Sequence, residues 1–151
     1  TQLGDGCTTK VDRAALRQVL LNFLDNAVKY GAAGQTVTVG ARCEPGALRL
    51  WVDDQGPGIP PRERARVWEP FQRLERDANS AVAGSGIGLS VVRDLVTLHG
   101  GRAWVDDAPG GGARFAIELP RHEPAATDGG STISPALPAA SGRTPRPRAG
   151  V

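Results

Sequence analysis

Two asparagines, a lysine and a tyrosine recur at helical spacing in the first quarter of the chain, at Asn22, Asn26, Lys29 and Tyr30. At 100° per residue these four side chains fall on a single polar stripe beside an apolar one. Amide oxygens, an ammonium group and an aromatic ring aligned in this way can contact a hard cation, an anion and a planar ring together. A solvated helix face is the alternative, although asparagine is a poor helix former.

A second group of polar and small residues is the run Asp54-Gln55-Gly56-Pro57-Gly58, which directly follows an expected strand. Glycines two and four residues after a carboxylate allow a ligand to approach the backbone closely. A carboxylate accepts a hydrogen bond from an exocyclic amino group and repels a carbonyl, so it could select adenine over guanine. An ordinary turn shaped by glycine and proline is the alternative.

Three glycines, Gly84, Gly86 and Gly88, open an expected helix. Free amides at a helix N-terminus favour phosphate binding. The segment lacks the Lys-Ser/Thr of a P-loop, and no strand precedes it as in a dinucleotide-binding motif. A flexible hinge is the alternative.

The run Trp68-Glu69-Pro70-Phe71-Gln72-Arg73 places two aromatic residues and a cation at the base of a polar loop. We expect Trp68 and Phe71 to be core residues that anchor this loop. Arg73 is then free to point at a phosphate group.

The elements that must position these groups follow from periodicity and from residues that end helices and strands. Asp12 is a suitable N-cap for the first helix, and Gly31 follows its end. The pattern predicts helices over 13–30, 61–67 and 89–99, and hairpins pairing 37–41 with 48–52 and 102–106 with 113–119. This order favours an α+β domain with helices on one face of a largely antiparallel sheet.

Charge and composition divide the 151 residues at Pro120. Residues 1–120 carry 14 basic and 14 acidic side chains, which argues against a nucleic-acid partner. Residues 121–151 are rich in proline, alanine and glycine and poor in large aliphatics, so we expect a disordered tail. The chain shows no membrane-spanning run or signal peptide, and Cys7 and Cys43 are too few for a disulfide scaffold, which favours a reduced, cytoplasmic domain.

The motifs taken together, in this order, resemble the catalytic, ATP-binding domain of sensor histidine kinases, within the superfamily of DNA gyrase, Hsp90 and MutL. The strings LRQVLLNFLDNAVKYG, VDDQGPGIP, VWEPFQR and GSGIGLSVV match the N, G1, F and G2 boxes. The resemblance covers about Val11 to Pro120, and the usual Gly-Thr of the last box is only approximated by Gly112-Ala113. It implies a two-layer α/β sandwich, the Bergerat fold, with helices on one face of a mixed, largely antiparallel sheet.

The resemblance also implies roles and partners. Asn26 would bind Mg²⁺, Asn22 would lie beside the ion, Lys29 and Arg73 would contact phosphates, Tyr30 would lie against adenine, and Asp54 would accept from its amino group. Further nucleotide contacts would come from Gly56, Gly58, Ile59, Gly84, Ser85, Gly86, Ile87, Gly88 and Leu89. The implied partners are a dimerisation domain that carries the phosphoacceptor histidine and a response-regulator receiver domain. Neither His99 nor His122 has the setting of that acceptor, so the chain is expected to be a fragment of a longer protein. The isolated chain is expected to be a monomer, and the parent protein could carry a membrane anchor.

One difference separates relatives within the superfamily. The ATP-hydrolysing members carry a glutamate where this chain has Asn22, and an amide cannot take a proton from water. The site is therefore expected to hold Mg-ATP for an external histidine rather than to hydrolyse it. The alternatives are a protein serine kinase of the anti-sigma-factor type and a module that responds to ATP without catalysis.

Overall fold

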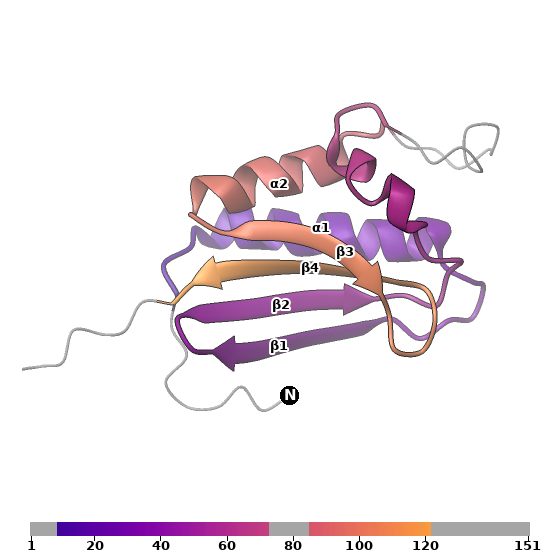
Figure 1. The fold of residues 1–151 in the computed structure, drawn as a ribbon, viewed down its shortest axis with the longest axis horizontal. Helices are drawn as coiled ribbons and strands as arrows, with labels where there is room; N and C mark the ends of the chain where they lie inside the picture. The colour runs from indigo at the N-terminus through magenta and orange to yellow at the C-terminus, as the bar shows by residue number, and fades with distance from the viewer. Residues whose placement is uncertain (1–8, 73–84, 122–151) are drawn as a thin grey trace, which may run out of the picture.

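The computed structural model describes residues 9–72 and 85–121 of the 151-residue chain. In chain order its elements are α1 (Arg13–Tyr30), β1 (Thr38–Glu44), β2 (Ala47–Asp53), the 3₁₀ turns η1 (Pro61–Glu63) and η2 (Arg66–Trp68), α2 (Gly88–Leu98), β3 (Arg102–Asp107) and β4 (Ala113–Pro120). Both helices lie on one side of a single sheet, which makes two layers (Figure 1). The expected α+β class is confirmed.

The first helix has the bounds that its sequence predicts. The Asp12 carboxylate accepts a hydrogen bond from the Ala14 N–H, and the Gly31 N–H donates to Ala27 O at the other end. Val19, Phe23 and Ala27 are buried at spacings of four residues and form the face that packs on the sheet. The polar stripe lies beside this buried face, as expected.

The sheet has the order β1-β2-β4-β3, and each of its three pairings is antiparallel. The expectation of a mixed sheet is therefore wrong for the described residues. Each hairpin joins its two strands through a short turn, so β1 pairs antiparallel with β2 and β3 with β4. The strands β2 and β4 also pair antiparallel. This central pairing sets Asp53 opposite Arg114, so the end of β2 meets the start of β4.

The core between the layers is built around three aromatic rings. Phe23, Trp68 and Phe115 have ring centroids 5.5–6.5 Å apart, with Phe23 stacked on Phe115 and Trp68 edge-on to both. Val92 and Val96 of α2 are almost fully buried in the same cluster. Trp68 is a core residue, as the sequence predicts.

Two local expectations are wrong. The segment 61–67 forms two 3₁₀ turns instead of a helix, because Pro60 and Pro70 leave too short a run between them. Phe71 is 78% exposed and is not a core residue. Its backbone has a φ of 61°, and its N–H donates to Gly86 O at 3.0 Å, which turns the side chain away from the core.

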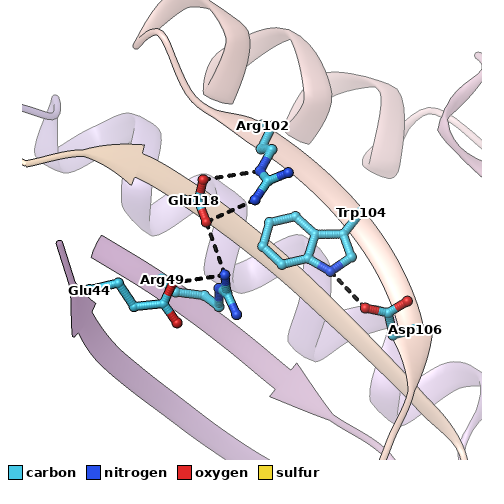
Figure 2. Close-up of polar contacts among 6 residues, drawn as sticks. All are labelled: Glu44, Arg49, Arg102, Trp104, Asp106 and Glu118. Carbon is cyan, nitrogen blue, oxygen red and sulfur yellow. Dashed lines mark hydrogen bonds and ion pairs between the residues drawn. The ribbon is translucent and has the colours of Figure 1, made fainter. Parts of the chain in front are cut away.

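The sheet face turned away from the helices carries a network of charges and rings (Figure 2). Glu118 accepts hydrogen bonds from Arg102 at 3.0 and 3.1 Å and from Arg49 at 3.1 Å. Both guanidinium groups lie about 5 Å from the ring centroid of Trp104, whose indole N–H donates to Asp106. The hydrogen bonds from Arg102 and Arg49 hold the pKa of Glu118 below its usual value.

Two further findings bear on the expected setting of the chain. Cys43 on β1 is disulfide-bonded, so the expectation of a reduced chain is wrong for this residue. Within residues 9–72 and 85–121, no helix has the length and apolar character needed to cross a membrane.

Candidate functional site

A cavity of about 300 Å³ lies between α1, the loop after β2 and the start of α2. The four residues of the polar stripe all line it, which brings together Asn22, Asn26, Lys29 and Tyr30 as the sequence predicts. Its other predicted lining residues are Asp54, Gly58, Ile59, Ser85, Gly86, Ile87, Gly88 and Leu89. Separate sequence motifs therefore meet around one space.

The α1 wall of the cavity carries amides and an ammonium group. The Asn22 Nδ2 atom is buried and has no hydrogen-bond partner among the described residues. Lys29 forms an ion pair with Asp25, one helical turn before it, and both line the cavity. A buried amide donor without a partner is costly, so an acceptor from a ligand would stabilise this wall.

The opposite wall is the N-terminal end of α2. Residues 85–89 line the cavity, so the free amides of the first helical turn border it. Gly88 packs against Asn22, because a Cβ atom on this glycine would lie 3.1 Å from Asn22 Oδ1. Gly86 has a φ of +70°, and a Cβ there would lie 3.0 Å from Phe71 Cα, so a side chain would be strained at this turn. The arrangement suits a phosphate group.

Asp54 lies at the other end of the cavity and is 5% exposed. Its Oδ1 atom accepts two backbone hydrogen bonds, from Gly56 N at 2.8 Å and from Ala113 N at 2.9 Å. No hydrogen bond reaches Oδ2 from the described part of the chain, which leaves one carboxylate oxygen for a ligand. Gly112 permits this arrangement, since a Cβ there would lie 2.2 Å from Asp54 O and 2.6 Å from Oδ1.

One predicted site residue of the described part, Gly56, does not line the cavity. A Cβ atom on Gly56 would come within 2.7 Å of Tyr30 O, so this glycine lets the loop pack on the end of α1. Arg73 and Gly84 lie outside the described residues.

Eight further residues line the cavity that were not predicted from the sequence: Gln18, Asp25, Pro57, Val67, Gln72, Val91, Ala113 and Phe115. Gln18 lies one turn before Asn22 and Asp25 lies within the stripe, so helical spacing from Asn22 could have found them. Ala113 and Phe115 reach the cavity only because β4 pairs with β2. No local sequence pattern predicts the pairing of β4 with β2.

The two-layer fold and the cavity define a nucleotide-binding domain, with an anion-binding helix end facing an amide-rich helix and a carboxylate at the far end. Residues 11–123 match the family described as histidine kinase-, DNA gyrase B- and HSP90-like ATPase. The chain belongs to this family, and it is an ATP-binding catalytic domain of the sensor histidine kinase type.

Relatives and solved structures agree with that assignment. The adaptive-response sensory kinase SasA of Trichormus variabilis is 44% identical over 110 residues, which is 72% of this chain and 27% of that protein. The mycobacterial sensor histidine kinase MprB has a structure with a TM-score of 0.68 and 39% identity, covering 76% of this chain and 78% of that one. Full-length ShkA in complex with AMPPNP gives a TM-score of 0.66 and 38% identity over 80% of this chain and 24% of that one. This chain thus spans about a quarter of the length of the curated relative SasA.

Proposed function

We propose that this domain binds Mg-ATP and presents its γ-phosphoryl group to a histidine on a separate dimerisation domain. The observation that carries the proposal is the cavity itself, in which the α1 amides face the N-terminal amides of α2 and Asp54 lies at the far end. The walls formed by α1 and α2 suit a triphosphate, and the end of the cavity that carries Asp54 suits an adenine ring.

The side chains of the cavity fit a magnesium ion that takes most of its ligands from water and phosphate oxygens. The described residues contain no group of three or more histidine, cysteine, aspartate or glutamate side chains that could hold a metal. Asn26 offers a neutral amide oxygen in the cavity, and Mg²⁺ usually keeps several waters and binds substrate phosphates. Asn26 would therefore hold the ion, Asn22 would lie beside it, and the ion would offset the charge of the phosphates.

The remaining contacts divide between phosphate and base. Lys29 would leave Asp25 to neutralise phosphate charge, and the α2 amides would bind the same group. Tyr30 would lie against the adenine ring, while Asp54 Oδ2 would accept from its amino group. Arg73 and Gly84 stay predictions, because both lie outside the described residues.

The cavity is suited to transfer rather than hydrolysis because of the residue at position 22. Asp54 would face the adenine ring and not the phosphates, and its Oδ1 holds two backbone amides. Asn22 stands where the hydrolysing relatives have a glutamate, and it cannot accept a proton. Water in the cavity would then lack a general base, and the phosphoryl group would await a stronger nucleophile.

The acceptor histidine and a receiver-domain aspartate would belong to other domains, since this chain spans a fraction of the length of its sensory-kinase relatives. Isolated, the chain would be a monomer. It should bind Mg-ATP, release phosphate very slowly and not label itself from γ-labelled ATP.

The test adds a dimerisation domain from the same parent protein to the chain and follows the label. An acid-labile, base-stable label on the added domain would support transfer to histidine. An acid-stable label on serine would favour the anti-sigma-type kinase instead. Turnover by the isolated chain at the rate of a dedicated ATPase would contradict the role given to Asn22.

A further inference from the structure

The three residues that follow β2 have each backbone N–H held by a different part of the molecule. Asp54 N donates to Ala113 O on β4 at 3.0 Å, and Gly56 N donates to the Asp54 carboxylate itself. Between them, Gln55 N donates to the side-chain oxygen of Gln35 at 2.8 Å. Of the three acceptors, Gln35 is the one that belongs neither to the sheet nor to the loop.

The same Gln35 side chain also contacts α1. Its Nε2 donates to Ala27 O in the last turn of the helix, which already accepts the N–H of Gly31. Gly31 has room for this amide only because it lacks a side chain, since a Cβ there would lie 1.7 Å from Gln35 Nε2. One amide group thus joins the C-terminal end of α1 to the backbone next to Asp54.

A second glutamine joins the same two loops in a different way. The Gln55 side-chain oxygen accepts the N–H of Thr36 at 3.0 Å. Gln55 and Thr36 are both exposed, so water can replace this bond at little cost. Gln35 is partly buried and uses both ends of its amide, so its loss removes the acceptor of Gln55 N and leaves Ala27 O with the N–H of Gly31 alone.

We propose that Gln35 is a positioning residue for the base end of the cavity. This inference rests on the proposed function, in which α1 binds the triphosphate and Asp54 binds the base. A nucleotide must reach both walls, so the spacing between α1 and Asp54 determines whether both contacts form together. Gln35 fixes that spacing, and it therefore acts on base selection without touching the phosphates.

The experiment compares Gln35→Met with the matched control Gln55→Met, which removes a side-chain hydrogen bond between the same two loops. Calorimetric titration of the full chain uses Mg-ATP, Mg-GTP and Mg-tripolyphosphate. Gln35→Met should weaken Mg-ATP binding about five- to tenfold and lower the ATP-to-GTP ratio by a similar factor, while tripolyphosphate binding stays within about twofold of the wild type. Gln55→Met should stay within about twofold for all three ligands.

A second control removes an ion pair on the far face of the sheet. Arg102→Gln loses its hydrogen bonds to Glu118 (Figure 2), so it should lower the thermal midpoint and leave the ATP-to-GTP ratio unchanged. This separates loss of stability from loss of positioning.

The outcomes are distinguishable. Wild-type selectivity in Gln35→Met, or an equal loss for all three ligands, would overturn the positioning role. A wild-type chain that binds tripolyphosphate but not ATP in preference to GTP would instead refute the base contact in the proposed function. If Gln35→Met does not fold, Gln35→Glu keeps the acceptor for Gln55 N and loses the donor to Ala27 O. That variant should lose part of the selectivity, and full selectivity in it would equally overturn the role.

Discussion

Replacing Asp54 by asparagine is expected to weaken the preference of the cavity for ATP over GTP without disturbing its walls. In the wild type, Asp54 Oδ1 accepts the N–H groups of Gly56 and Ala113 at 2.8 and 2.9 Å. An asparagine must direct its single oxygen toward these two donors, because the opposite rotamer would place an NH₂ group against them. The amide nitrogen would then take the place of Oδ2 and face the base.

The magnitude follows from the bonds exchanged. The variant loses a hydrogen bond from the adenine amino group to a charged acceptor, which contributes roughly 1.5–3 kcal/mol. That corresponds to a loss of about 10- to 150-fold in affinity for ATP. The new NH₂ group can donate to the guanine oxygen, so GTP binding should tighten. Because both backbone bonds to the side chain survive, stability should fall by only about 1 kcal/mol.

The assay is calorimetric titration of the wild type and Asp54→Asn with Mg-ATP and Mg-GTP, with urea unfolding to measure stability. Ala113→Ser serves as a control, since it changes a cavity residue beside Asp54 while keeping the N–H that donates to it. Equal ATP-to-GTP ratios in the wild type and Asp54→Asn would show that another group selects the base. The reasoning about the rotamer would fail if stability fell by several kcal/mol.

Three other perturbations test the site and the sheet. Asn26→Ala should weaken Mg-ATP binding by about tenfold or more while calorimetric unfolding stays near wild type, since it removes the proposed metal ligand and no core contact. Gly112→Ala should destabilise the fold by about 2–4 kcal/mol in urea, because its Cβ would lie 2.2 Å from Asp54 O; Gly111→Ala has a similar φ with no atom nearby and should cost less. Glu118→Gln should lower the thermal midpoint at neutral pH. Because the folded pKa of Glu118 is lowered by its arginine partners, that stabilisation is present above its usual 4.5 and is lost as pH falls through the folded value, so the difference from wild type should shrink below pH 4.5.

The first helix was the most predictable element of this fold. The bounds of α1 follow from Asp12, which caps the first turn, and from Gly31, which ends the last one. The polar stripe could be placed on the cavity because helical spacing fixes which side chains share a face. Local signals of this kind are contained within a few residues of sequence, so no tertiary contact was needed to interpret them.

Expectations failed where a tertiary contact overrides the local pattern. Phe71 is an aromatic residue next to a buried tryptophan, and apolarity alone predicts burial. The hydrogen bond from its N–H to Gly86 O holds its backbone in a left-handed conformation, which exposes the ring. The β4 wall of the cavity was missed for a related reason, since Ala113 is 59 residues from Asp54 in sequence.

The two ends of the cavity differ in how far the protein completes them without a ligand. At the base end, backbone amides and Gln35 already hold Asp54 and its loop in place, so little reorganisation is needed on binding. At the other end, Asn22 Nδ2 has no partner among the described residues, and Lys29 is paired with Asp25. A triphosphate would accept a hydrogen bond from Asn22 Nδ2 and would compete with Asp25 for Lys29. Base recognition is therefore expected to depend on a preformed geometry, whereas phosphate binding depends on contacts that exchange when the nucleotide arrives.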